Sequence, residues 1–421
     1  MSGSGRHKTT VCPTRGGHLI FRIAILWLTA AGAAGQDWPQ FLGPGRDGVY
    51  SGKDLAASWP ASGPAIVWKR EVGQGFSSPV LAEGRLILFH RVGDKEVVEA
   101  LDAGTGRAIW KFEYPTQYRD DFGFDEGPRA TPTVTGGRVY TFGAEGSLHC
   151  LDFATGKQIW SLDTQRQFQV AKGFFGAAGA PLVDGGRVLM NVGGALAGLA
   201  AFDAATGKTL WTIANQEASY SSPVAATIQG ARHALFFTRS GLVDVDPAAG
   251  KVRYELPWRA RMRASVNAAT PLVVDDLVFV SASYGTGAVL LQVASTGLKK
   301  IWASDDALTN HYSTSVYKDG FLYGFHGRQE EGQSLRSIEF KTGKVRWSID
   351  GFGAGTVTLA GDKLLIVREG GELVLAAAEP GAFRKISEAK ALPAPIRAYP
   401  AIANGRLYVR NEKTLVCLNL R

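Results

Sequence analysis

The chain has 421 residues, of which 45% are hydrophobic and 20% are charged, a composition typical of soluble globular proteins. Its formal net charge is +8. The charges are not gathered into a concentrated basic stripe, which excludes a typical nucleic-acid-binding surface. The 52 glycines indicate many tight turns.

The first 35 residues have the order of a secretory signal peptide. Four basic residues and no acidic residue occupy positions 1–22, an apolar run follows from Ile23 to about Ala31, and small residues continue through Gly35. The apolar run is shorter than the ~20 residues that span a bilayer. We therefore expect cleavage near Gly35, a periplasmic or extracellular mature protein of net charge about +4, and no stable membrane insertion after cleavage.

Residues 36–64 are predicted to be an irregular lead-in segment, and a repeat begins after them. The repeat has an aspartate, a Thr-Gly turn and a final tryptophan, and its clearest copies are Leu101–Trp110, Leu151–Trp160 and Phe202–Trp211. Weaker copies are Val245–Tyr254, Val293–Trp302 and Ile338–Trp347, and the copy around Glu379–Gly381 is eroded.

A second signature precedes each copy: an apolar strand, a turn with Gly or Asp, and another apolar strand. Clear examples are Ser78–Leu88, Thr131–Tyr140, Ala180–Leu189 and Tyr399–Tyr408, and related versions begin near Ser222, Thr270, Ser313 and Gly355. Each unit thus has four strands in forty-odd residues, the pattern of a propeller blade. Eight starts predict an all-β, eight-bladed β-propeller of four-stranded antiparallel blades over residues 65–421.

The ring is expected to close through an N-terminal strand. The last unit, 398–419, supplies only three strands, while residues 65–71 form an isolated fourth-strand copy whose Trp68 matches Trp110. We expect this strand to complete the eighth blade and leave no unpaired inner edge.

The repeated residues are interpreted as structural. The tryptophans are expected to pack between neighbouring sheets, with Tyr254 as the substitute in the fourth blade, and the aspartates to accept hydrogen bonds in turns. Cys150 and Cys417 lie on blades two and eight, too far apart for a disulfide, and are expected to be small buried hydrophobes.

The connections that lead into each innermost strand are expected to gather at one mouth of the channel. The longest covers residues 118–129. The candidate ligand-binding residues in these connections are Arg129, Tyr220, Arg263, Asn267, His311 and Arg397. Guanidinium groups match carboxylates, so the ligand would be a small anion. Alternatively, these groups only solvate a polar channel and pair with Asp120, Asp121, Asp125 and Glu126. No motif assigns a catalytic or metal-binding residue.

The tiled motif resembles the quinoprotein (PQQ-like) propeller repeat over residues 65–419, and Asp37–Gly48 looks like the opening of secreted bacterial members. Two kinds of better understood relative are the PQQ-dependent alcohol dehydrogenases and the propeller lipoprotein of the outer-membrane β-barrel assembly machinery. The resemblance implies adjacent cysteines and a calcium site in the former and a lipid-modified cysteine after the signal in the latter. This chain has no Cys-Cys pair, and Cys12 lies upstream of the apolar run.

Fold does not settle function, and three functions remain open. The leading prediction is a non-catalytic binding or scaffold propeller with no cofactor, whose partner is an envelope protein or a small anionic ligand and not a nucleic acid. The main alternative is a quinoprotein dehydrogenase that oxidises an alcohol or sugar with PQQ and calcium. The third is a hydrolase or lyase that uses the channel mouth.

Overall fold

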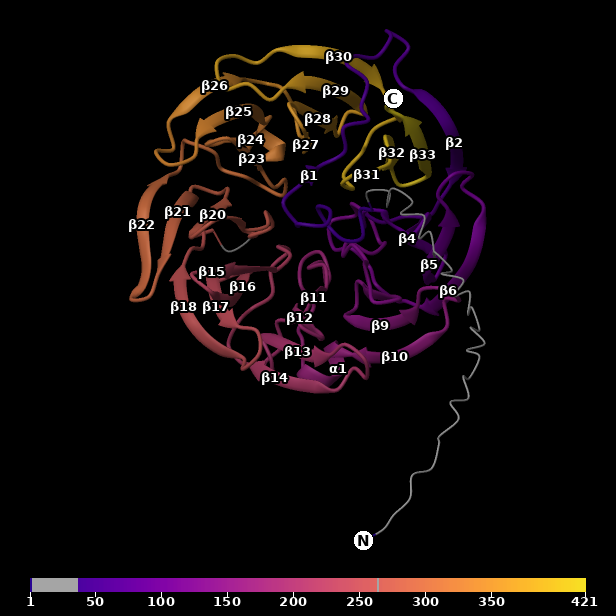
Figure 1. The fold of residues 1–421 in the computed structure, drawn as a ribbon, viewed down its shortest axis with the longest axis vertical. Helices are drawn as coiled ribbons and strands as arrows, with labels where there is room; N and C mark the ends of the chain where they lie inside the picture. Colours follow the sequence, from indigo (N-terminus) through magenta and orange to yellow (C-terminus); the bar gives the residue numbers. More distant parts are fainter. Residues whose placement is uncertain (2–36, 263–264) are drawn as a thin grey trace. The chain divides into compact units, whose positions relative to one another are not determined.

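The computed structural model describes Met1 and residues 37–262 and 265–421. The expected signal peptide lies outside the described residues. Eight sheets are arranged in a ring (Figure 1), which confirms the eight-bladed propeller. The first blade consists of β3 (Val80–Ala82), β4 (Arg85–Val92), β5 (Lys95–Asp102) and β6 (Ala108–Pro115), and the second of β7 (Thr133–Thr135), β8 (Arg138–Phe142), β9 (Ser147–Asp152) and β10 (Gln158–Asp163). The third consists of β11 (Leu182–Asp184), β12 (Arg187–Asn191), β13 (Leu199–Asp203) and β14 (Thr209–Ile213), and the fourth of β15 (Val224–Ile228), β16 (Ala231–Phe237), β17 (Gly241–Asp246) and β18 (Lys251–Pro257).

The other four blades repeat the same antiparallel order from the innermost to the outermost strand. The fifth consists of β19 (Leu272–Val274), β20 (Leu277–Ala282), β21 (Gly287–Ala294) and β22 (Gly297–Ser304), and the sixth of β23 (Val316–Lys318), β24 (Phe321–His326), β25 (Ser334–Glu339) and β26 (Val345–Ile349). The seventh contains β27 (Gly355–Ala360), β28 (Lys363–Arg368), β29 (Glu372–Ala377) and β30 (Lys385–Lys390), and the eighth combines β31 (Ala401–Ala403), β32 (Arg406–Arg410) and β33 (Thr414–Asn419) with β2 (Ala65–Glu71). Within the described ranges, two short helical segments, α1 (Thr164–Phe168) and a 3₁₀ turn at Gln329–Glu331, lie in connections.

The ring closes as the sequence predicts. β2 pairs antiparallel with β33, with Trp68 opposite Cys417, and so supplies the outer strand of the eighth blade. This joins the start of the repeat region to its end by backbone hydrogen bonds, which protects both from fraying.

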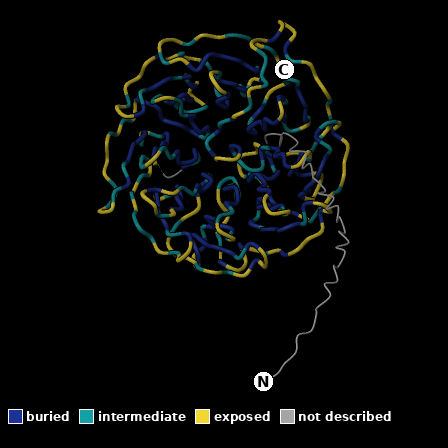
Figure 2. Tube along the Cα trace, in the orientation of Figure 1, coloured by how far each residue is buried: buried dark blue, intermediate teal, exposed yellow. Residues whose placement is uncertain are grey.

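The core lies in the seams between blades. One apolar cluster, for example, joins Tyr140 and Phe142 of the second blade to Val188 and Phe202 of the third. Burial is concentrated in the inner strands, whereas the outer rim is exposed (Figure 2). β2 shows the rim pattern, with exposed and half-buried residues along its length.

In six of the eight blades the repeated tryptophan joins its blade to the next, which confirms its structural role. The indole Nε1–H of Trp160 donates to the backbone carbonyl of Ala204 at 3.2 Å. Equivalent bonds join Trp68 to Ala103, Trp110 to Phe153, Trp211 to Pro247, Trp302 to Phe340 and Trp347 to Glu379. The turn glycine of the next blade lies against the ring: a Cβ at Gly156, whose φ is +72°, would stand 2.4 Å from the Trp110 ring. Glycine is therefore required there by both φ and space.

The repeated aspartates are turn residues, as expected. Asp102 Oδ1 accepts hydrogen bonds from the backbone N–H and the hydroxyl of Thr105 at 2.8 and 2.7 Å, and Asp152 binds Thr155 in the same way. These bonds lower the pKa of both carboxyl groups. Cys150 and Cys417 are free and buried, which confirms the prediction for the cysteines.

The lead-in segment crosses the centre of the ring (Figure 1). Trp38 forms a bridge with Leu81 of the first blade, and Val134 N–H donates to the Pro39 carbonyl at 2.8 Å. The segment then forms β1 (Val49–Tyr50), which pairs in parallel with β27 and adds a fifth, innermost strand to the seventh blade.

Arg46 is the buried charged side chain of this segment, only 3% exposed. It donates to the carbonyls of Pro181 and Pro223 and to the hydroxyl of Thr133, which belong to three different blades. No carboxylate is among these partners, and burial lowers the pKa of Arg46 to about 9. The segment thus occupies the middle of the ring just below the starts of the inner strands.

Candidate functional site

The mouth of the ring is formed at one repeated position, three residues before the proline that opens an inner strand. Because the blades share this register, the side chains at this position lie at one level of the ring. They are Phe76, Arg129, Tyr220 and Arg397, ahead of Pro79, Pro132, Pro223 and Pro400. Arg46 bonds to carbonyls close behind this level, so a ligand would enter from the mouth side.

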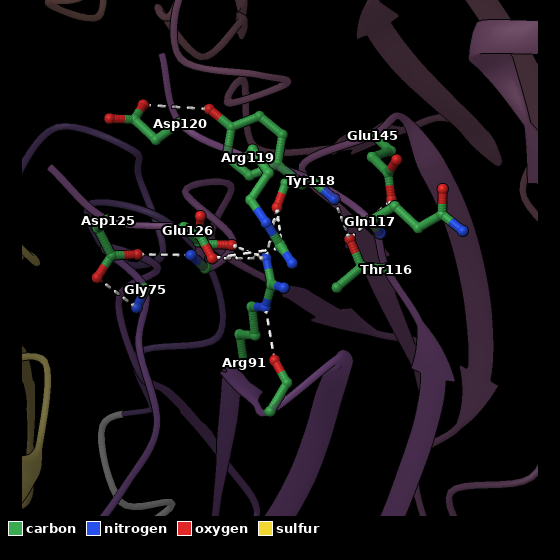
Figure 3. A network of polar contacts seen from close by, with 12 residues as sticks. Gly75, Arg91, Thr116, Gln117, Tyr118, Arg119, Asp120, Asp125, Glu126 and Glu145 are labelled. Atoms are coloured by element: carbon green, nitrogen blue, oxygen red, sulfur yellow. Dashed lines mark hydrogen bonds and ion pairs between the residues drawn. The ribbon is translucent and has the colours of Figure 1, made fainter. Parts of the chain in front are cut away.

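The longest connection is held in place by buried polar groups (Figure 3). Arg91 is 4% exposed, and its Nη1 donates to the carbonyls of Tyr118 and Glu126 at 2.7 and 3.1 Å. The Asp125 carboxylate accepts from the backbone N–H groups of Gly75 and Gly127 at 2.9 and 2.6 Å. The loop between these fixed points therefore holds residues 119–124 at the mouth.

Arg129 is enclosed by aromatic rings. Its guanidinium carbon lies 5.3 Å from the ring centroid of Phe76, 5.8 Å from that of Tyr118 and 5.7 Å from that of Phe175. Nη2 donates to Asp120 Oδ1 at 3.1 Å and to the Asp125 carbonyl at 3.2 Å. Nη1 is buried and has no hydrogen-bond partner among the described residues.

Arg397 belongs to the same cluster. Its guanidinium carbon lies 5.5 Å from the Phe76 centroid and 5.0 Å from that of Phe124. The two guanidinium carbons are thus no more than about 11 Å apart, since both lie near the Phe76 ring. Nε of Arg397 donates to Glu369 Oε1 at 2.5 Å. The structure thus brings two arginines from blades far apart in the sequence to one ring.

Phenylalanines form an exposed platform beside these arginines. The side chains of Phe122 and Phe124 are 54% and 47% exposed, and their rings stack with centroids 6.3 Å apart. Phe175 lies beneath them, 5.2 Å from Phe122 and 6.1 Å from Phe124. We call Phe122, Phe124, Phe174 and Phe175 the mouth platform.

Tyr220 supports the mouth platform from below. Its ring meets Phe175 edge-on at 5.5 Å, and its hydroxyl accepts the Phe175 backbone N–H at 3.0 Å. Burial raises the pKa of Tyr220, while Arg129 and Arg239 partly oppose that rise. The phenol is therefore protonated at neutral pH and keeps one proton to donate.

Asn267 is placed differently from this cluster. It is 4% exposed, and its amide donates both protons to backbone carbonyls, of Thr238 at 2.8 Å and Trp258 at 3.0 Å. The backbone carbonyl of Asn267 accepts hydrogen bonds from the backbone N–H groups of Tyr220 and Ser221. In this structure Asn267 positions Tyr220; its predicted ligand contact stays a prediction.

His311 is connected to the cluster through polar residues. Its Nε2 lies 2.8 Å from the Tyr284 hydroxyl, and its Nδ1 accepts the Gln329 backbone N–H at 3.3 Å. The Gln329 side chain donates to Glu369, the partner of Arg397. Burial lowers the pKa of His311, so the ring is neutral. Arg263, the remaining candidate, lies outside the described residues.

A cavity of about 610 Å³ opens beside the mouth platform. Its wall includes Tyr118, Lys172, Phe174 and Tyr220. This volume is in the range of small-molecule sites, ~300–1,000 Å³. The mouth therefore has an exposed apolar platform and an adjoining polar cavity.

Phe76 is the main residue that the sequence analysis missed. Its signal was available, because it precedes Pro79 by the same three residues that separate Arg129 from Pro132. Arg46 was missed too, since it precedes the repeat and has no counterpart in it. Its position depends on a segment crossing the ring, which no local pattern predicts.

The described mouth residues do not fit a calcium-held quinone. No group of three or more His, Cys, Asp or Glu side chains in residues 37–262 and 265–421 is arranged to hold a metal ion. Asp120 binds Arg129, Asp125 binds backbone N–H groups, and Glu369 binds Arg397 and Gln329. We therefore assign no step to that cofactor.

A family model described as outer membrane protein assembly factor BamB matches residues 93–348 and 331–419. The chain belongs to this family of PQQ-like β-propellers. The match confirms the resemblance drawn from the repeat.

Curated relatives match over short stretches. The chain is 32% identical over 155 residues to the quinohemoprotein alcohol dehydrogenase ADH-IIG of Pseudomonas putida, which covers 35% of this chain and 21% of the relative. It is 30% identical over 193 residues to the quinohemoprotein alcohol dehydrogenase of Comamonas testosteroni, covering 44% of this chain and 26% of the relative. The chain thus spans about a quarter or less of each relative's length.

Solved structures of both kinds share the fold. The Comamonas testosteroni dehydrogenase aligns with a TM-score of 0.68 at 16% identity, covering 91% of this chain and 80% of that one. BamB from Moraxella catarrhalis aligns with a TM-score of 0.62 at 16% identity, covering 84% and 96%. At such identities the likeness shows the fold alone. Among the helices of the described residues, none has the length and apolarity to cross a membrane.

Proposed function

We propose that the protein is a secreted, non-catalytic binding or scaffold propeller of the cell envelope that holds a protein partner at its channel mouth. The observation that carries this proposal is the mouth platform, with Phe122 and Phe124 about half exposed beside Arg129 and Arg397. Aromatic residues and arginine are the types enriched at the energetic centres of protein interfaces. Exposed apolar groups gathered at one place mark interaction sites more often than scattered ones.

The platform is tested by the double variant Phe122→Ala/Phe124→Ala. Purified, tagged mature protein would be crosslinked to partners in an envelope extract, and the captured proteins identified by mass spectrometry. We expect recovery of the specific partner to fall by about tenfold or more, since aromatic anchors at interface centres contribute at least ~2 kcal/mol each. The thermal midpoint should change little, because both rings are about half exposed and lie in a surface connection outside the core.

The matched control is Ile109→Ala/Ile159→Ala, which removes two exposed apolar side chains, 46% and 44% exposed, from outer strands. It should capture partners like the unmodified protein. Equal capture by the platform variant and this control would contradict a binding role for the mouth platform.

The alternative function is a quinoprotein dehydrogenase, favoured by the 30–32% identity to quinohemoprotein alcohol dehydrogenases over part of the chain. Bound PQQ would supply two-electron oxidation of an alcohol. The mature protein should be titrated with PQQ and calcium by absorbance and calorimetry, and assayed for dye-linked alcohol oxidation. We expect no saturable binding and no turnover, because the mouth carboxylates are already engaged. Saturable binding with turnover would replace the scaffold proposal by the dehydrogenase.

A further inference from the structure

Arg129 has an unused hydrogen-bonding capacity that the fold does not explain. Its side chain is 10% exposed, so it is nine-tenths buried. Nη2 donates hydrogen bonds to the Asp120 carboxylate and the Asp125 backbone carbonyl, whereas Nη1 is buried and has no partner among the described residues. Buried donors are almost always paired in native proteins, because an unpaired one loses its hydration without compensation. An unpaired guanidinium edge at a mouth points to a ligand.

The surroundings of this edge define the ligand's chemistry. The guanidinium is held by the faces of Phe76, Tyr118 and Phe175. A guanidinium has only donors, so the ligand must bring acceptor oxygens. The half-exposed Phe124, which contacts both Phe175 and Arg397, favours an apolar group beside those oxygens.

The charge balance selects between the anions that arginine binds. Arg129 is paired with Asp120 and Arg397 with Glu369, and these carboxylates repel a dianion such as phosphate more strongly than a monoanion. Arg397 uses only Nε in hydrogen bonds among the described residues and lies on the same Phe76 ring. Both guanidinium groups thus keep donors available for acceptor oxygens, and the planar carboxylate matches the fork of a guanidinium.

We propose that Arg129 and Arg397 form a binding site for a carboxylate carried on an apolar group, with Phe124 and Phe175 packing against that group. The proposal rests on the proposed function and names the chemistry that the mouth recognises. The carboxylate belongs either to a free small molecule or to an acidic residue beside an aromatic residue of a polypeptide.

In the first test, 3-phenylpropionate and its uncharged amide analogue, 3-phenylpropanamide, are titrated into the mature protein. Binding is measured by calorimetry and by ligand-observed NMR. We expect the carboxylate to bind at least about tenfold more tightly, because the amide cannot form the charge-assisted pair. Equal binding of the two compounds, or binding of neither, would overturn the proposal.

Variants localise the site. Arg129→Gln and Arg397→Gln should each weaken carboxylate binding about tenfold or more, while Arg119→Gln should not, since Arg119 is 64% exposed on the same loop. Arg397→Gln leaves Glu369 paired with Gln329, so it keeps the test valid even if Arg129→Gln does not fold. Unchanged affinity in Arg397→Gln would exclude this site.

A second arm distinguishes the source of the carboxylate. A short peptide with an internal Glu-Phe pair and blocked ends is compared with its Gln-Phe twin. Tighter binding of the Glu-Phe peptide than of 3-phenylpropionate supports a polypeptide ligand, and the reverse supports a free small molecule. If Arg397→Gln binds 3-phenylpropionate with unchanged affinity while the Phe122→Ala/Phe124→Ala variant loses the envelope partner, the carboxylate site is wrong and the proposed function stands.

Discussion

Replacing His233 by leucine is expected to lower the free energy of unfolding by about 3–5 kcal/mol, one of the two largest effects we predict. The Asp244 side chain is fully buried, and His233 Nδ1 lies 2.8 Å from its Oδ2. The imidazole is the hydrogen-bonding partner of that carboxylate. Removing it leaves an uncompensated buried acid, and urea unfolding followed by circular dichroism measures the loss.

The pair lies in the fourth blade, at a place where this blade departs from the repeat. Asp244 lies opposite Tyr254, the substitute for the repeated tryptophan. The residues opposite the tryptophan in other blades are neutral: Ala100, Cys150, Ala201, Leu290, Ser337 and Cys417. Tyr254 still reaches the next blade, since its hydroxyl donates to the Ala294 carbonyl at 2.9 Å.

The control is the double variant His233→Leu/Asp244→Leu. Replacing both members of a buried hydrogen-bonded pair by apolar groups can be nearly neutral or stabilising, so this variant should regain most of the lost stability. A double variant as unstable as His233→Leu would show that packing, rather than the unpaired carboxylate, dominates.

Replacing Arg46 by methionine is expected to lower the free energy of unfolding by about 2–4 kcal/mol. Its guanidinium bonds Gln40, Thr133 and the Pro223 carbonyl at 2.9, 3.2 and 2.8 Å. Methionine fills similar space but removes the donors to the buried Pro223 carbonyl and the buried Thr133 hydroxyl. Thermal unfolding should show the loss, and hydrogen exchange should show faster exchange in residues 37–50, which Arg46 anchors.

Arg107→Met is the matched control, because Arg107 is exposed on the turn after Asp102. It should unfold like the unmodified protein. Similar unfolding and hydrogen exchange for the Arg46 and Arg107 variants would contradict a structural role for Arg46 at the centre of the ring.

Much of the fold could be predicted because the structure of a propeller blade is specified by short sequence patterns that recur in every blade. Apolar runs, Gly turns and the Asp-to-Trp motif each specify a structure within a few residues, and their recurrence predicted the number of blades. The fourth-strand copy around Trp68 predicted the closure that β2 and β33 form.

The candidate site could be predicted only in part. The sequence located the mouth connections and named Arg129, Tyr220 and Arg397, which the structure gathers around Phe76 and Phe175. It could not separate them from Asn267, whose amide holds two backbone carbonyls. A polar side chain in a mouth connection can either contact a ligand or hydrogen-bond to the backbone. Neighbouring residues from other repeats determine which of these two roles it has.

By itself the sequence determined the all-β class, the eight blades, the packing of tryptophans between neighbouring blades and the closing strand, because each follows from hydrogen bonding and packing that recur within one unit. Only the tertiary structure placed Arg46 in the middle of the ring, brought Arg129 and Arg397 to one phenylalanine, and left Nη1 of Arg129 without a partner among the described residues. Those contacts join residues up to hundreds of positions apart. They exist only once the ring has closed, and no local pattern specifies them.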